Sequence, residues 1–217
     1  MKLFIRYTLQ LAVLAVFCCA STVVQAAAYD DLLRATEMGD TSAVERLLER
    51  GADPNTTDAK GNTLLMIAAR SGNRELVWSL IRRKASATKR SQVGDTALMM
   101  ASLRGDREIA RMLIEFGGAQ VKHSGWAPIH YAAFEDRAEM IRYLIAKGAD
   151  KDAVAPNGYT ALMLAARGGH LAAARALLYE DVDVQVKGPG GETAFRIARE
   201  KKHAELMELL KRAGAVE

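Results

Sequence analysis

Cysteine, proline and aromatic residues are scarce in this chain, and each shortage excludes a class of protein. Only two of the 217 residues are cysteines, and they are adjacent, which excludes a disulfide framework and a cysteine-rich metal site. Four prolines and 6% aromatic residues, beside abundant alanine and leucine, favour helices over a β-sandwich. Half of the residues are hydrophobic and 26% are charged. This composition is typical of a globular protein and argues against a disordered or collagen-like chain.

Long hydrophobic runs are missing as well. The apolar stretch at residues 9–19 follows a short positively charged start and falls short of the roughly 20 residues that cross a bilayer. Small residues follow it, which is the layout of a secretory signal peptide. We therefore predict a signal peptide over residues 1–28, cleaved near Ala26 or Ala28, with an uncleaved anchor as the alternative.

Export has two consequences for the mature chain. Cys18 and Cys19 leave with the signal peptide, which suits an oxidising compartment where a free thiol forms wrong disulfides. We therefore predict a periplasmic or secreted location. Loss of Lys2 and Arg6 lowers the formal net charge from +4 to +2, an excess too small to indicate nucleic-acid binding. We expect no nucleic-acid partner and no membrane contact beyond export.

The remainder of the chain repeats one motif. Glycines that precede an expected helix are spaced by 33, 31, 33 and 33 residues. Self-similarity at this period is the signature of a solenoid. The glycines are Gly61, Gly94, Gly125, Gly158 and Gly191, and the segments beginning two residues later read TLLMIAA, TALMMAS, APIHYAA, TALMLAA and TAFRIAR. Nine residues past the start of each segment come Gly72, Gly105, Asp136, Gly169 and Lys202.

Local signals predict two helices in each copy. A threonine at the segment start can accept a hydrogen bond from an orphan backbone N–H. Pro128 stands at a first helical position, where its missing N–H costs nothing. The second helices carry apolar residues at helical spacing, as in Leu76, Val77, Leu80 and Ile81. The glycines just past the second helices, where a left-handed cap favours glycine, are Gly51, Gly117, Gly148 and Gly214.

This pattern resembles the ankyrin repeat, with its G-x-T-P-L-H-x-A-A, G-H and G-A-D elements, and the resemblance covers residues 29–217. It implies an all-α, ankyrin-repeat solenoid of about six helix-turn-helix repeats with short β-turn or hairpin tips. Because one repeat cannot bury its own apolar face, the core exists only in the stack. The expected repeats are an N-terminal capping repeat at 29–57, internal repeats at 58–90, 91–121, 122–154 and 155–187, and a C-terminal capping repeat at 188–217.

Three features depart from the family pattern. His130 alone keeps the histidine that the family places after the threonine position. Ala127 lacks the capping hydroxyl, a loss on the order of 1 kcal/mol. The copy ending near Lys122 is two residues short, which predicts a tighter turn before Gly125 and a local irregularity in the stack. The residues that replace the histidine in the other copies are Met66, Met99, Met163 and Arg196.

Catalytic and metal-binding motifs are absent from the sequence. The resemblance implies that His130, His170 and His203 bond backbone groups, and His123 stands alone at a turn tip. His170 and His203 are one repeat apart, near the roughly 8–10 Å between packed helix axes. That is too far to share a metal held at about 2 Å. We expect no enzyme activity, no cofactor and no metal, and an enzyme would have to depend on His123.

The resemblance implies that another protein binds at the turn tips and along the exposed side of the first helices, which line a concave groove. Trp126 and Tyr159 occupy equivalent tip positions on adjacent repeats, and Phe134 lies further along the groove. Clustered aromatic side chains are typical of interface hot spots, each worth ~2 kcal/mol or more. The alternative is that Trp126 folds back onto the irregular turn and only packs. His123, at its own tip, completes this candidate partner-binding site.

Arginines near the ends of the first helices form a candidate basic stripe made of Arg70, Arg104 and Arg167, with Arg199 after them. Such a stripe favours an acidic partner surface. The alternative is ordinary solvated arginines. Trp78 is a weaker candidate, since its position faces the convex side.

The export signal and the solenoid together predict an exported, monomeric, non-catalytic module that binds another protein. The chain is similar to exported bacterial ankyrin-repeat proteins associated with catalases, which implies support of an oxidative-stress enzyme. The alternative is an immunity-type inhibitor that covers the active site of a toxin in the periplasm.

Overall fold

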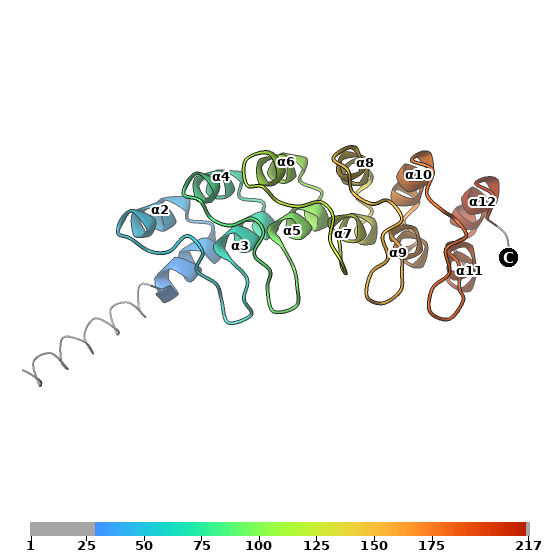
Figure 1. Ribbon diagram of the computed structural model, residues 1–217, viewed down its shortest axis with the longest axis horizontal. Coiled ribbons are helices and arrows are strands. Elements are labelled where there is room, and N and C mark those ends of the chain that lie inside the picture. The colour runs from blue at the N-terminus through green and yellow to red at the C-terminus, as the bar shows by residue number, and fades with distance from the viewer. Residues whose placement is uncertain (1–28, 216–217) are drawn as a thin grey trace, which may run out of the picture.

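The computed structural model describes residues 29–215, which form a stack of paired helices (Figure 1). The predicted signal peptide, residues 1–28, lies outside the described residues. Residues 29–38 are helical and precede α2. The first helices of the later pairs are α3 (Leu64–Ser71), α5 (Ala97–Arg104), α7 (Pro128–Phe134), α9 (Ala161–Gly168) and α11 (Ala194–Glu200). The second helices are α2 (Thr41–Glu49), α4 (Arg74–Arg82), α6 (Arg107–Glu115), α8 (Ala138–Ala146), α10 (Leu171–Tyr179) and α12 (Ala204–Arg212).

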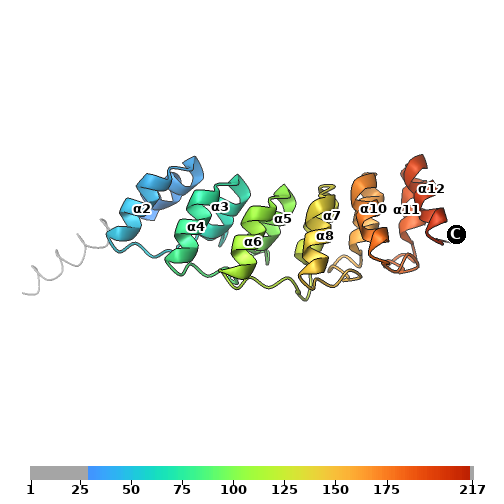
Figure 2. The same cartoon turned by 90° about the horizontal axis from the view of Figure 1, so that it is seen from above.

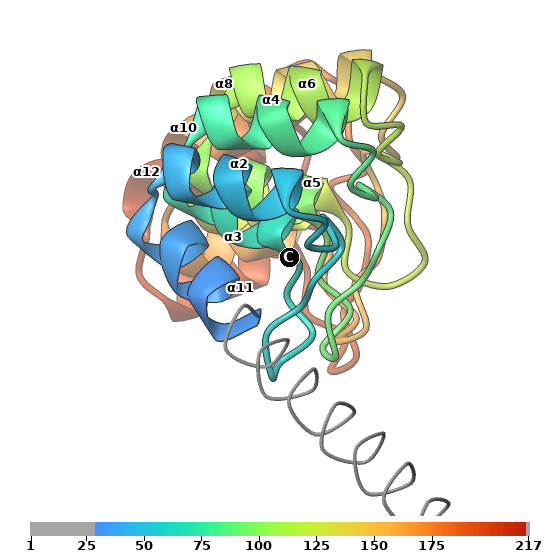
Figure 3. The same cartoon turned by 90° about the vertical axis from the view of Figure 1, so that its left-hand side faces the viewer.

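The helices form two parallel rows. The first helices pack on one another and make an inner row, and the second helices pack on one another and make an outer row. Figure 1 shows the outer row above the inner row, with the connecting tips hanging below, and Figure 2 shows the pairs following one another along one axis. Seen along the stack in Figure 3, the tips project to one side. This arrangement confirms the predicted all-α solenoid.

The core runs continuously along the stack. Small residues in the inner row let neighbouring helices approach closely, and Ala68, Ala133 and Ala165 are fully buried. Leu98 and Ile129 fill the space between adjacent helices and are also fully buried. Because each repeat covers the apolar face of its neighbour, the stability of one repeat depends on the next.

Hydrogen bonds begin the inner helices where the sequence predicts them. Thr63, Thr96, Thr160 and Thr193 each accept a bond from the backbone N–H three residues later. Helix α7 starts at Pro128, as predicted, and has no capping hydroxyl. There the N–H of Ala127 donates to Nδ1 of His130 over 3.0 Å. Thus, His130 anchors the start of an inner helix that has no capping threonine.

The irregular copy differs from its prediction at one glycine. Gly118, with φ of 69°, takes the left-handed conformation that we predicted for Gly117. The reason is an extra residue in the turn that follows α6, where the N–H groups of Phe116 and Gly117 both donate to the carbonyl of Met112. Gly125 then comes only seven positions after Gly118, whereas Gly94 comes ten positions after Lys84.

The shortened connection also changes the tip. In other copies a hairpin bond closes it, as between the Asp58 N–H and the Asn62 carbonyl or the Ala155 N–H and the Tyr159 carbonyl, both at 2.9 Å. Within residues 29–215 no equivalent bond reaches Trp126. Isolated β-bridges mark two of the regular tips, Thr57 with Thr63 and Val154 with Thr160. The stack is therefore irregular between its third and fourth helix pairs, and α8 packs more extensively on α10 than on α6.

Candidate functional site

Trp126 lies at the irregular tip and packs against its own repeat. Its ring meets those of His130 and Tyr131 edge-on, with centroids 5.7 and 6.1 Å apart. The side chain is half-buried. Part of its area therefore serves packing, and the remainder faces solvent on the tip side.

Tyr131, which the sequence reasoning overlooked, joins two repeats beside Trp126. Its hydroxyl donates to the carboxylate of Asp95 in the preceding repeat. Burial, and after it the Asp95 carboxylate, raises the pKa of Tyr131. The sequence did carry a signal, because this position holds aliphatic residues or methionine in the other copies, namely Ile67, Met100, Leu164 and Ile197.

Tyr159 occupies the tip after Trp126 and connects to the last repeat. A hydrogen bond with the Glu192 side chain, followed by burial, raises the pKa of Tyr159. The backbone N–H of Glu192, and after it the bond with Tyr159, lowers the pKa of Glu192. Phe134, by contrast, ends α7 with 57% of its surface exposed. Of the three predicted aromatic contacts, Phe134 therefore offers the most free surface to a partner.

His123 is not alone at its tip. Nη2 of Arg90, from the preceding tip, lies 2.5 Å from Nδ1 of His123. Burial, and then the Arg90 charge, lowers the pKa of His123. The residue lines a shallow depression of about 200 Å³ together with Asp150 and Ala153. A neutral imidazole that accepts from an arginine links neighbouring tips, which gives His123 a structural partner, and its Nε2 is buried.

The predicted basic stripe does not follow a single row. Arg70 and Arg167 share one position in the repeat, where α7 carries Phe134, while Arg104 comes one position later. Nη1 of Arg104 donates to the Arg70 carbonyl over 3.4 Å. A Cβ atom on Gly72 would lie only 2.7 Å from Cζ of Arg104, so this guanidinium rests on the glycine. The structure thus brings Arg70 and Arg104 together at the ends of two adjacent inner helices.

Side chains of one repeat bond the preceding inner helix at two further junctions. Nε of Arg137 donates to the Leu103 carbonyl over 3.1 Å. Nε2 of His203 lies 3.4 Å from the Arg167 carbonyl, so this histidine bonds the backbone of the preceding repeat. These contacts satisfy carbonyls at the ends of the inner helices, which otherwise lack partners.

The start of α10 is capped by a side chain from another repeat. Its N-cap residue, His170, makes no capping bond with its side chain. The N–H of Ala173 donates instead to the carboxylate of Asp136 over 2.7 Å. Asp136 therefore supplies the cap that the sequence assigned to no residue.

The part of the chain that the structure describes bears on two further possibilities, a metal site and a membrane span. Within residues 29–215, no three or more His, Cys, Asp or Glu side chains gather as metal ligands. None of the helices in that range has the length and apolarity to cross a membrane.

The burial and hydrogen bonds of His130 lead us to expect that the stability of the protein depends on pH. It is fully buried, its Nδ1 accepts the Ala127 N–H, and its Nε2 donates to the Ala153 carbonyl over 2.9 Å. This geometry requires the neutral ring, and burial lowers the pKa of His130. Below the unfolded pKa of about 6.5, the unfolded chain binds a proton that the folded chain excludes. Stability is therefore fully present above that pH and is lost as the pH falls toward the folded pKa.

Urea unfolding at pH 7.5 and pH 5.5 tests this expectation. His130→Met places the residue of three other copies at this site and removes the titrating group. The variant is expected to be less stable than the wild type at neutral pH, because it loses both hydrogen bonds, but to lose less further stability on acidification. An equal acid sensitivity in the two proteins would show that His130 contributes nothing to it.

Comparisons with known proteins agree with the fold. The family model described as ankyrin repeats (3 copies) matches residues 32–122, 65–155 and 150–216. An ankyrin repeat-containing protein of Treponema pallidum (strain Nichols) is 37% identical over 101 residues, which are 46% of this chain and 34% of that protein. The chain thus spans about a third of the length of this relative.

Two solved structures are also similar. The human ASB11 ankyrin repeat domain superposes with a TM-score of 0.79 at 24% identity, over 85% of this chain and 84% of that one. An ankyrin repeat domain from Acinetobacter baumannii AYE gives 0.73 at 27% identity, over 85% of this chain and 98% of that one. With the family model matching almost every described residue, the chain belongs to the ankyrin repeat family.

Proposed function

We propose that this chain is a non-catalytic module that holds a protein partner against its tips and inner helices. Ankyrin repeat domains are generally non-enzymatic interaction modules. The observation that carries the proposal is the exposed ring of Phe134 at the end of α7, in the same repeat as the half-buried Trp126 and adjacent to the repeat of Tyr159. Aromatic side chains with free surface on a preformed scaffold are the usual anchors of protein interfaces.

The proposal includes an exported location for the chain and an oxidative-stress enzyme as its partner. The pattern of residues 1–28 supports export to the periplasm or the medium. The resemblance to exported bacterial ankyrin-repeat proteins supports an oxidative-stress enzyme, such as a catalase, as the partner. Affinity capture from periplasmic extract with the mature chain, followed by mass spectrometry, tests this choice. Recovery of catalase is the expected result, whereas recovery of a toxin domain in its place would assign the chain to the immunity-type inhibitors.

Removal of the aromatic anchors is expected to weaken partner binding. Phe134→Ala and Tyr159→Ala should each raise the Kd for the captured partner by roughly 30-fold, the equivalent of about 2 kcal/mol. Trp126→Ala should lower the affinity and also the melting temperature, because that ring packs on His130 and Tyr131. Titration calorimetry with the purified partner and thermal melts of each variant separate the two effects.

The matched control is Tyr179→Ala, which removes a tyrosine with 83% of its surface exposed at the end of α10, in the outer row. It should leave the affinity unchanged. If the control weakens binding as much as Phe134→Ala does, the partner does not bind the tip side.

A further inference from the structure

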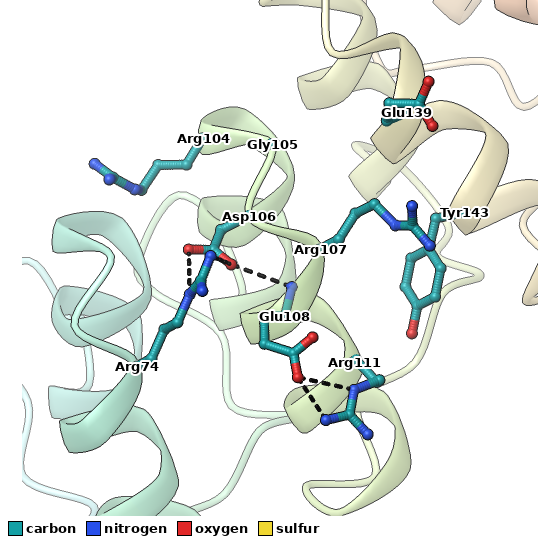
Figure 4. Close-up of a pocket in the computed structure, with 9 residues that line it drawn as sticks. All are labelled: Arg74, Arg104, Gly105, Asp106, Arg107, Glu108, Arg111, Glu139 and Tyr143. Carbon is teal, nitrogen blue, oxygen red and sulfur yellow. Dashed lines mark hydrogen bonds and ion pairs between the residues drawn. The ribbon is translucent and has the colours of Figure 1, made fainter.

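A depression of about 670 Å³ opens at the edge of the stack where inner helices end and outer helices begin (Figure 4). It lies at the opposite ends of the inner helices from the tips, because its lining includes the last residue of α5 and the first residues of α6. The irregular junction between α6 and α8 forms one wall. Its lining contains four arginines, Arg74, Arg104, Arg107 and Arg111, together with Tyr143 and the acidic residues Asp106, Glu108 and Glu139.

A large side chain marks this junction. Tyr143 of α8 is aromatic at a position where the other outer helices carry Arg46, Ser79, Met112, Ala176 and Leu209. The guanidinium of Arg107 lies 5.4 Å from the centroid of the Tyr143 ring, and Nζ of Lys147 lies 5.7 Å from it. Cations on an aromatic ring gain attraction from its electron-rich face. The ring therefore holds Arg107 toward α8, as Figure 4 shows.

The positive charges at the depression are only partly neutralised. Arg74 pairs with Asp106 at 3.2 Å, and Arg111 pairs with Glu108 at 2.5 Å. Within residues 29–215, Arg107 has no carboxylate partner, and Arg104 bonds only the Arg70 carbonyl. Two guanidinium groups with unused donors thus line one open depression.

Their positions favour an extended ligand over a single small anion. Figure 4 shows Arg107 directed toward Tyr143 on one side of the start of α6, and Arg104 on the other side. A chain with several carboxylates can cross the start of α6 and place one carboxylate on each guanidinium group. Guanidinium groups present planar pairs of donors that match carboxylate oxygens.

We propose that this depression binds an acidic segment of a protein partner, with one carboxylate on Arg107 and another on Arg104. The inference rests on the proposed function, since it adds a second contact, remote from the tips, with a protein partner. Exposed charge pairs contribute mostly to the association rate and to partner choice. The contact should therefore weaken as salt screens it.

Binding of a fluorescent hexaglutamate peptide, measured by anisotropy at low and moderate ionic strength, tests the site directly. The wild-type protein should bind the peptide more weakly as salt rises. The double variant Arg104→Ala/Arg107→Ala should bind it roughly fivefold to tenfold more weakly at low salt. The matched control is Arg175→Ala, which removes an exposed arginine of α10 outside the depression and should leave binding unchanged. Circular dichroism confirms that each variant is folded.

Several outcomes would overturn the inference. The first is an unchanged affinity of the double variant for hexaglutamate, and the second is no detectable peptide binding by the wild type. The third is displacement of the peptide by sulfate at matched concentration. Tighter binding of an oligothymidylate than of hexaglutamate would do the same, because the site would then select phosphates of nucleic acid.

The two proposals fail separately. If Phe134→Ala and Tyr159→Ala leave partner affinity intact while hexaglutamate binding still depends on Arg104 and Arg107, the tip-side surface is wrong and the acidic contact stands. If the arginine variant changes neither peptide nor partner binding while the aromatic variants do, the acidic contact is wrong and the tip-side surface stands.

Discussion

Leu162→Ala is expected to lower the free energy of unfolding by roughly 2–5 kcal/mol. Leu162 is 2% exposed and lies in α9, which packs against α7 on one side and α11 on the other. Truncation removes apolar contacts with both neighbours and leaves a cavity that short, tightly capped helices cannot close. Urea unfolding followed by circular dichroism measures the loss.

Truncation of an exposed side chain creates no buried cavity. The control is again Tyr179→Ala at the surface of α10, which is expected to change stability by no more than about 0.5 kcal/mol. Because repeats support one another only through their interfaces, the damage in Leu162→Ala should extend to the adjacent helices. Hydrogen exchange should show faster opening of α9 and α11 than of α3. A uniform, small loss of protection along the stack would contradict a nearest-neighbour core at this position.

Features that depend on a few neighbouring residues were predictable from the sequence. The glycine period, the threonine caps and the start of α7 at Pro128 all follow from backbone groups within one turn of the residue concerned. The family resemblance rests on these local signals. The glycine and threonine signals recur in most copies, so the loss of one in a single copy does not obscure the repeat.

Features that depend on contact between repeats were not predictable in this way. The sequence shows that one copy is two residues short, but not that its connection loses three residues while the turn after α6 gains one, which moves the left-handed conformation to Gly118. The bond from Arg104 to the Arg70 carbonyl and the cap from Asp136 to α10 join residues 34 and 37 positions apart. No periodicity within a repeat encodes such pairs.

The candidate site was predictable only in part, because it depends both on the register within a repeat and on contacts between repeats. Tip positions for Trp126 and Tyr159 follow from the repeat register, but the packing of Trp126 on His130 depends on the shortened tip. Tyr143 stands at a position where the outer helices share no residue type, so the sequence carried no signal for it, and the charged depression beside it needed the spacing of α6 and α8. A site built across repeats therefore depends on contacts that the register of a single copy does not encode.

Gly158→Ala should destabilise the protein by roughly 2–4 kcal/mol, the sum of two separate penalties. Gly158 has φ of 79°, a left-handed conformation that costs an alanine about 1–2 kcal/mol. A methyl group there would also overlap the ring of Pro189 in the next tip, with Cδ only 2.5 Å away. Because the proline ring cannot rotate away as a long side chain does, the two tips must separate.

Gly191→Ala carries the conformational penalty alone. Gly191 holds the same position one repeat later, with φ of 74°, and a methyl group there would meet no atom within 4 Å. This variant should lose only the conformational cost, about 1–2 kcal/mol. Urea unfolding of both variants gives the difference, which measures how tightly neighbouring tips are held. Equal losses would mean that the tips move apart freely, and a partner gripped by several tips at once would then have to order them on binding.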